Sequence, residues 1–91
     1  MTIRIRLPSV LRSYCAGASE LSLSAVTVRG ALEQIERRHP ELYRSICDET
    51  GAMRRHVNVF VNKSNVRDGA GLESALAPGD TITILPAVSG G

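Results

Sequence analysis

One pattern in the chain leaves little choice of fold: four short segments place an apolar side chain at every second position. In the clearest of them, residues 56–62, the alternating residues are Val57, Val59 and Val61. A period of two is that of a β-strand with one face on a core. The same alternation occurs in three further segments, at residues 2–7, 20–24 and 81–85. The sequence therefore predicts a sheet of at least four strands.

One amphipathic helix is predicted between the second and third of these strands. Thr27 is a favourable N-cap residue, and His39-Pro40 ends the pattern because the residue before a proline avoids helical geometry. Between them, one apolar stripe recurs at three- and four-residue spacing: Val28, Ala31, Leu32 and Ile35. A further short turn is expected between residues 42 and 46.

The connections between these elements are expected to be turns and loops. Residues 13–19 should be a polar loop that joins the first two strands as a hairpin, and residues 48–55 a second polar loop. After the turn at residues 62–65, Val66 is expected to begin a short return strand. Residues 68–77 should form a loop with a helical turn. Pro78-Gly79-Asp80 is a strong turn signal, and Pro86 is expected to end the last strand.

These elements define an α+β fold with a mixed sheet of four to five strands packed on one main helix. The chain has 91 residues, which is the size of one domain. We expect the domain to span residues 1–86, with residues 87–91 as a tail that ends in Gly-Gly.

Composition argues against several classes of function. A net charge of +2 is small for a nucleic-acid partner, and 3% aromatic residues leave little for stacking on bases. The pairs Arg37-Arg38 and Arg54-Arg55 are read as solvated surface. We expect no membrane segment, because no apolar stretch approaches the length of a span, and the first residues lack the apolar core of a signal peptide. A cytoplasmic location is the expectation that follows.

The residues that commonly carry chemistry are sparse. Cys15 and Cys47 are isolated and are read as small buried or half-buried thiols, and His39 and His56 are not spaced to complete a metal site with them. The chain shows no acid–base pair, phosphate-binding glycine loop or metal cluster. We therefore expect no catalytic residue, no bound metal and no cofactor of its own.

The order of elements, together with the end of the chain, resembles the MoaD/ThiS sulfur carriers, which have the ubiquitin-like β-grasp fold. The ending that carries the resemblance is a Pro-Gly-Asp turn, an alternating strand, a proline and a five-residue tail with Gly90 and Gly91 last. The strand at residues 58–62, the segment 66–72 and the run Ile-Leu-Pro-Ala-Val also resemble the actinobacterial carrier of thiocarboxylate-dependent cysteine biosynthesis. Ser89 departs from the alanine of that type, so the pathway stays open.

The resemblance implies a role for Gly91. An E1-like enzyme would use ATP to adenylate its carboxylate, and a sulfur donor would then convert it to a thiocarboxylate. The tail residues would thread into the active site of a partner: Pro86, Ala87, Val88, Ser89 and Gly90. Glycine fits the two last positions because, without Cβ, it passes a narrow channel and adopts backbone conformations closed to other residues.

A docking surface is predicted on the outer face of the sheet. Alternation places Phe60 opposite Val59 and Val61, so we expect this one phenylalanine to be exposed to solvent. If the last strand lies between the first and the third, as in this family, five residues share that face: Arg4, Arg6, Phe60, Thr83 and Leu85.

Several functions fit this pattern. We favour a carrier for cysteine biosynthesis, whose partners would be a cysteine-synthase-like enzyme and a metalloprotease that releases the product. The alternatives are the small subunit of molybdopterin synthase, which would partner the large subunit, and a ubiquitin-like protein modifier. A plain binding module with an inert tail is a fourth candidate. Trimming the last two residues would abolish a carrier but not a binding module.

Overall fold

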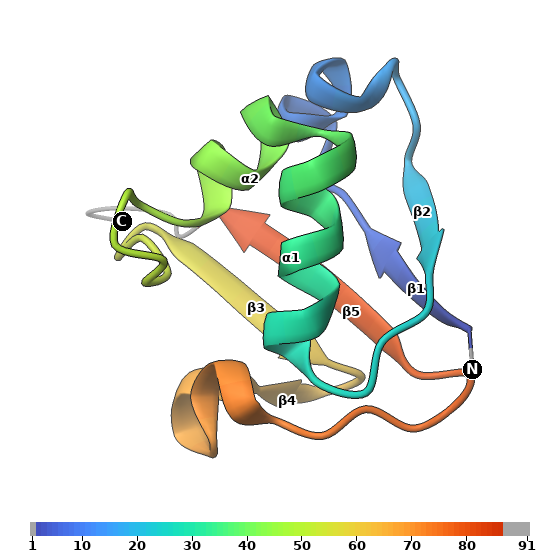
Figure 1. The fold of residues 1–91 in the computed structure, drawn as a ribbon, viewed down its shortest axis with the longest axis vertical. Coiled ribbons are helices and arrows are strands. Elements are labelled where there is room, and N and C mark those ends of the chain that lie inside the picture. Colours follow the sequence, from blue (N-terminus) through green and yellow to red (C-terminus); the bar gives the residue numbers. More distant parts are fainter. Residues whose placement is uncertain (1, 87–91) are drawn as a thin grey trace.

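The computed structural model describes residues 2–86 and shows two layers, a five-stranded sheet and helices packed on one of its faces (Figure 1). The strands are β1 (Ile3–Arg6), β2 (Glu20–Leu23), β3 (Val57–Val61), β4 (Ser64–Asn65) and β5 (Thr81–Pro86). The helices are α1 (Val28–Arg38) and α2 (Pro40–Ile46), with three 3₁₀ helices, η1 (Ser9–Cys15), η2 (Val66–Asp68) and η3 (Gly71–Glu73). The predicted α+β class with a mixed sheet is confirmed.

The last strand lies in the centre of the sheet, where the resemblance placed it. The strand order is β2-β1-β5-β3-β4, with β5 parallel to β1 and antiparallel to β3. β1 and β2 pair antiparallel, so the predicted hairpin is confirmed. Because β1 and β5 run in the same direction, both end at the same end of the sheet (Figure 1). That end is where residues 87–91 leave the described part of the chain.

An aliphatic core fills the space between the sheet and α1. All four residues of the predicted helical stripe are buried, and so are Ile3, Ile5, Ile82 and Ile84 from the two central strands. Leu42 and Ile46 of α2 are also buried, so the expected short turn is a helix that contributes to the core. Val57 and Val59 face the core as predicted, whereas Val61 is only half-buried.

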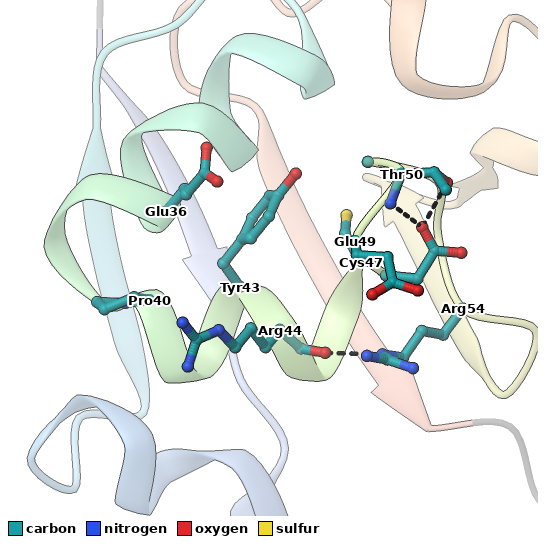
Figure 2. Close-up of a pocket in the computed structure, with 10 residues that line it drawn as sticks. Glu36, Pro40, Tyr43, Arg44, Cys47, Glu49, Thr50 and Arg54 are labelled. Carbon is teal, nitrogen blue, oxygen red and sulfur yellow. Dashed lines mark hydrogen bonds between the residues drawn. The ribbon is translucent and has the colours of Figure 1, made fainter.

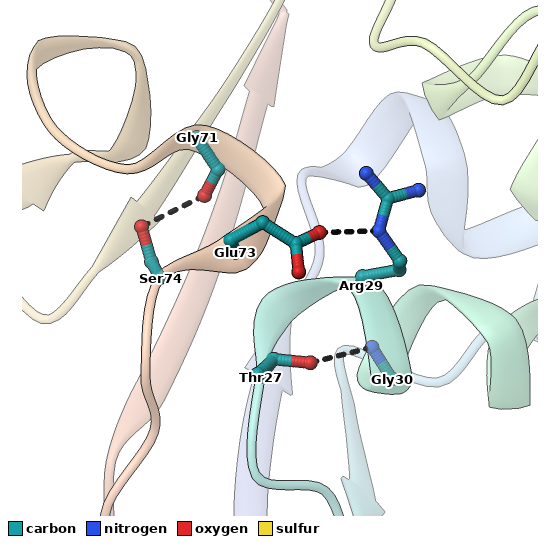
Figure 3. A network of polar contacts seen from close by, with 6 residues as sticks. All are labelled: Thr27, Arg29, Gly30, Gly71, Glu73 and Ser74. Atoms are coloured by element: carbon teal, nitrogen blue, oxygen red, sulfur yellow. Dashed lines mark hydrogen bonds and ion pairs between the residues drawn. The ribbon is translucent and has the colours of Figure 1, made fainter.

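A polar network fixes the start of α1 against the segment that follows β4 (Figure 3). Thr27 caps the helix as predicted, since its Oγ1 accepts a hydrogen bond from the Gly30 amide at 3.1 Å. Arg29 Nε donates to Glu73 on η3, and the hydroxyl of Ser74 donates to the Gly71 carbonyl at 2.7 Å. The contact between Arg29 and Glu73, together with the hydrogen bond from the Val28 amide to the Ser74 carbonyl at 3.1 Å, holds η3 beside the first turn of α1.

Two predicted connections differ from the structure. Residues 13–15, which were expected in the first loop, belong to the 3₁₀ helix η1, because Pro8 starts the turn and Leu11 and Cys15 pack inward. Val66 does not begin the return strand. That strand is β4, and Val66 starts η2 because the Asn65 side chain caps it by accepting from the Arg67 amide at 2.9 Å.

Among the described residues, no helix is both long enough and apolar enough to cross a membrane. The expected division into a domain of residues 1–86 and a tail of residues 87–91 stays a prediction.

Candidate functional site

The root of the tail is held by the sheet. Pro86 is the last residue of β5, where it lies opposite Val57 of β3, and Leu85 lies opposite Asn58. Pro86 thus ends the last strand, as the sequence predicted, and its role in threading into a partner stays a prediction. The other predicted tail residues lie outside the described residues: Ala87, Val88, Ser89, Gly90 and Gly91.

The outer face of the sheet brings the five predicted docking residues together. Thr83 lies between Arg6 of β1 and Phe60 of β3, since it pairs with both. Arg4 lies two residues before Arg6 on the same face, opposite Thr81. Leu85 continues the row towards the tail and is 43% exposed. One continuous surface therefore runs from Arg4 to the end of β5.

Phe60 is half-buried, which corrects the expectation that it is exposed to solvent. Its neighbours in the sheet are Thr83 on one side and Asn65 of β4 on the other. Side chains on both sides of a strand cover part of a ring that lies between them. Leu85 is thus the more accessible apolar residue of this face.

The two arginines of this face differ in their surroundings. Arg6 Nε lies 3.9 Å from Glu20 Oε2 on β2, and both side chains are largely exposed. An exposed pair at this distance contributes little to stability, so Arg6 can exchange its partner at low cost. Arg4 lies opposite Ser22 and Thr81, two neutral residues. Both cations are available to an acidic surface.

A hollow lies between α2 and the loop at residues 48–55 (Figure 2). Some of its polar groups are bound to one another. Asp48 accepts hydrogen bonds from the Thr50 hydroxyl at 2.6 Å and the Thr50 amide at 2.8 Å, which lower the pKa of its carboxyl. Arg54 Nε donates to the Arg44 carbonyl at 2.7 Å. These hydrogen bonds stabilise the loop and join it to α2.

The two cysteines are free and buried, as expected. Burial raises the pKa of both thiols, so less of the reactive thiolate is present at neutral pH. Within residues 2–86, no group of three potential ligands is placed to hold a metal ion. The described residues thus supply a scaffold and surfaces, and the predicted chemistry lies at Gly91.

Sequence reasoning missed a second surface at the tail root. Val10 and Tyr14 of η1 are 64% and 43% exposed, and together with Leu11 they line a groove that reaches Pro86. A signal was present, because residues 10, 11 and 14 are apolar at the spacing of one helical face. This spacing was not recognised, because the segment was not predicted to be helical.

Comparison with known proteins defines the family. A sequence profile of the ThiS family matches residues 5–91. The chain belongs to the ThiS family. The match extends through the last glycine, so the ThiS pattern includes the Gly-Gly end as well as the folded part.

Relatives in this family include carriers and a modifier. The chain is 34% identical to the sulfur carrier protein CysO of Mycobacterium tuberculosis, over 100% of both chains. It resembles a crystal structure of the Amycolatopsis orientalis BexX/CysO complex with a TM-score of 0.89 and 35% identity, covering 98% of this chain and 99% of that one. Small archaeal modifier protein 1 of Haloferax volcanii is 35% identical over 65 residues, 71% of this chain and 70% of the relative.

These likenesses confirm the fold that the resemblance implied. The ThiS chain has the ubiquitin-like β-grasp fold, with α1 packed across a sheet whose two central strands, β1 and β5, are parallel. The Mycobacterium tuberculosis relative, which matches over its full length, is named as a sulfur carrier.

Proposed function

We propose that this protein is a sulfur carrier: an E1-like enzyme adenylates the carboxylate of Gly91 with ATP, and a sulfur donor then converts it to a thiocarboxylate. The observation that carries the proposal is the full-length likeness to CysO, joined to a ThiS match that runs to Gly91. The carrier brings no cofactor of its own, since ATP belongs to the reaction of the activating enzyme.

The chemistry explains why a carrier needs this ending. A terminal carboxyl group has a pKa of about 3.5, so it is an anion at neutral pH and a poor electrophile. Adenylation makes one oxygen part of a good leaving group, AMP, and releases pyrophosphate. Hydrosulfide that attacks the acyl carbon then expels AMP and leaves the thiocarboxylate. None of these steps requires a general base or nucleophile from the carrier.

The folded part would dock the partners. The continuous outer face from Arg4 to Leu85 lies beside the strand that leads to the tail, so a partner that binds this face can receive residues 87–91. The CysO of the Amycolatopsis complex is a relative of this chain that binds a protein. Apolar Leu85 and Phe60 would contribute binding, and Arg4 and Arg6 would guide an acidic partner surface.

We further propose cysteine biosynthesis as the pathway. The support is the likeness to CysO, together with the run of residues 84–88, Ile-Leu-Pro-Ala-Val, which resembles the ending of that type of carrier. The thiocarboxylate sulfur would replace the activated oxygen on the side chain of an activated serine bound by a cysteine-synthase-like enzyme, and that oxygen would leave with its activating group. An acyl shift to the amine would then follow, and a metalloprotease would release cysteine by hydrolysis.

Two other functions use the same ending. A small subunit of molybdopterin synthase would pass its sulfur to the large subunit. A protein modifier would join Gly91 to lysines of target proteins, and the likeness to small archaeal modifier protein 1 supports this second candidate. Both require adenylation, so they differ from the cysteine route only after activation.

Intact mass spectrometry tests the carrier role directly. The protein is incubated with the cognate E1-like enzyme, ATP and sulfide, and its mass is compared with a chain that lacks Gly90 and Gly91. We expect the mass gain of one oxygen-to-sulfur exchange, located at Gly91, in the full chain alone. A full-length protein that stays unchanged beside an active enzyme contradicts the proposal.

The pathway is tested with the thiocarboxylate form. Incubation with the cysteine-synthase-like enzyme, activated serine and the metalloprotease should give free cysteine and return the carrier to its original mass. Sulfur transfer to molybdopterin synthase, with no cysteine formed, would assign the molybdopterin route instead.

A further inference from the structure

The end of the sheet from which the tail leaves carries an unusual amount of accessible apolar surface. The large apolar side chains that are most exposed in the described residues are Val10, Tyr14, Val26 and Leu85. Val10 and Tyr14 line the groove that ends at Pro86, and Leu85 is the residue before it. Three of these four residues therefore surround the tail root.

The position of Val10 and Tyr14 is fixed by the fold. Arg12 Nε donates to the Leu7 carbonyl at 3.2 Å, and the Gly17 amide donates to the Arg12 carbonyl at 2.7 Å. Cys15 is buried beneath the helix. The segment is thus tied down at both ends, and its two apolar side chains are held outward at little further cost in conformational entropy when a partner binds.

The charge of the groove is positive. Arg54 and His56 line it, and none of the described residues that line it carries a carboxylate. The backbone of Arg54 is itself anchored, because its carbonyl accepts from Arg67 Nη2 at 2.7 Å, and Arg67 Nη2 also donates to the Val57 carbonyl at 2.8 Å. A fixed cation beside an apolar ledge suits a partner with apolar side chains bordered by carboxylates.

The length of the tail brings a partner against this groove. Five residues follow Pro86, and a fully extended chain of that length reaches about 18 Å. A protein that takes Gly91 into an enclosed active site must therefore come close to Pro86 and to what surrounds it. Leu85 lies on the outer face of the sheet, whereas the groove lies beside η1, so the two surfaces flank the tail root (Figure 1).

We propose that Val10, Tyr14 and Pro86 form a second docking surface, which contacts the mouth of the activating enzyme's active site. The enzyme's side of this contact would consist of apolar side chains bordered by carboxylates. This inference rests on the proposed carrier function. The proposed surface adds a contact with η1 to the docking face predicted on the sheet. The activating enzyme would then contact the carrier on both sides of the tail.

The chain offers a matched pair of variants to test this surface. Val10 and Val26 are the same residue type with almost equal exposure, 64% and 62%. Val10 follows β1, whereas Val26 follows the antiparallel strand β2 and lies at the opposite end of the sheet (Figure 1). Val10→Asp and Val26→Asp therefore change charge and hydrophobicity equally, at the tail root and away from it. Tyr14→Ser is a second variant in case Val10→Asp does not fold.

The readout is kcat/KM of the cognate E1-like enzyme for each carrier, measured from the rate of pyrophosphate release. We expect Val10→Asp and Tyr14→Ser to lower it about ten-fold, and Val26→Asp to change it by less than about two-fold. Val10→Lys should lose less than Val10→Asp, because a lysine meets carboxylates. Equal rates for Val10→Asp and Val26→Asp, or a Val10→Lys variant as poor as Val10→Asp, overturn the proposed surface.

Other occupants of the groove give different results. If a second copy of the chain covered it, Val10→Asp would change the oligomeric state and leave kcat/KM unaltered. If the chain's own tail covered it, Val10→Asp would raise the rate. Either result overturns the proposal while wild-type protein still forms thiocarboxylate. Absence of thiocarboxylate in wild-type protein instead overturns the carrier function, and this inference with it.

Discussion

Asn62 joins the end of β3 to the start of β5 through Asp80: the Asn62 Nδ2 group donates to Asp80 Oδ1 at 3.1 Å. The other carboxylate oxygen of Asp80 accepts from the Ala77 amide at 2.8 Å, which closes the Pro-Gly-Asp turn. Asn62 Oδ1 in turn accepts from the Thr81 amide at 3.1 Å. The Pro-Gly-Asp turn therefore aligns the last strand with its neighbour.

These hydrogen bonds make the stability of the turn depend on pH. The bond from the Ala77 amide, followed by that from Asn62, lowers the pKa of the Asp80 carboxyl in the folded state. A lowered folded pKa stabilises the fold above the unfolded pKa of about 3.9, and this contribution is lost as pH falls through the folded pKa. We expect Asp80→Asn to reduce the free energy of unfolding at neutral pH. The difference in this free energy between wild type and variant should become progressively smaller below the unfolded pKa.

Urea denaturation at a series of pH values measures this difference. Asp68→Asn is the matched control, because within residues 2–86 no hydrogen bond to the Asp68 side chain is seen. If the difference in the free energy of unfolding between wild type and Asp80→Asn stays constant down to the acid range, the charge of Asp80 is not what stabilises the turn.

The cap of α1 leads to a second stability prediction. Thr27→Ala removes the acceptor of the Gly30 amide, and the loss of an N-cap typically costs about 1 kcal/mol. Ser24→Ala, three residues earlier in an exposed position, is the control and should be close to neutral. Both are measured by urea denaturation, and equal midpoints for the two variants would contradict the capping role.

The main elements could be predicted because burial leaves a periodic signature. Val57 and Val59, two residues apart, are both buried in a strand, and Val28 and Ile35, seven residues apart, lie on one buried helical face. The Thr27 cap and the Pro78–Asp80 turn were predicted for the same kind of reason, since each depends on neighbours in the chain. Local chemistry is readable without knowledge of the tertiary structure.

What could not be predicted depends on contacts between distant residues. Phe60 was expected on the surface, but Asn65 of β4 lies beside it in the sheet, and the sequence placed the start of that strand two residues too late, at Val66. Val10 and Tyr14 were overlooked because their place beside Pro86, at the end of β5, is a contact between residues far apart in the sequence. The central position of β5 came from the resemblance to a family and not from periodicity.

A substitution of Phe60 tests the outer face. Phe60→Ser should weaken binding of the activating enzyme about ten-fold or more, because truncation of a central aromatic commonly costs more than 1 kcal/mol. Tyr43→Ser is a matched control, since Tyr43 is a half-buried aromatic residue in the helical layer, on α2. Binding is measured by titration calorimetry, and melting temperatures of both variants show whether the fold survives. Equal affinities for two folded variants would remove Phe60 from the docking face.

Gly90 provides a prediction about the tail. If residues 87–91 pass through a narrow channel, Gly90→Val should slow adenylation strongly and Gly90→Ala less so, because a β-branched side chain adds more bulk and restricts the backbone more. The melting temperature should not change. Pyrophosphate release measures the rates, and two variants as fast as wild type would refute the threading argument.

Lysine content separates a carrier from a modifier. The chain has ten arginines and one lysine, Lys63, and the guanidinium group of arginine stays protonated and does not attack an acyl group. Lys63 lies in the turn after β3, and the neighbouring Asn62 amide donates to the carbonyl of Thr81, the first residue of β5, at 2.7 Å. The tail leaves from the other end of β5, about 17 Å away along the strand.

For Gly91 to reach Lys63 of the same molecule, the tail would therefore have to run back along almost the whole sheet in a fully extended form. Lysine-linked self-conjugates should thus form only between molecules, and only at Lys63. For a carrier we expect none: after incubation with the activating enzyme and ATP, wild type and Lys63→Arg should each give one band on a denaturing gel. A series of larger bands in wild type that Lys63→Arg abolishes would show that the activated tail acylates lysine, which is the chemistry of a modifier.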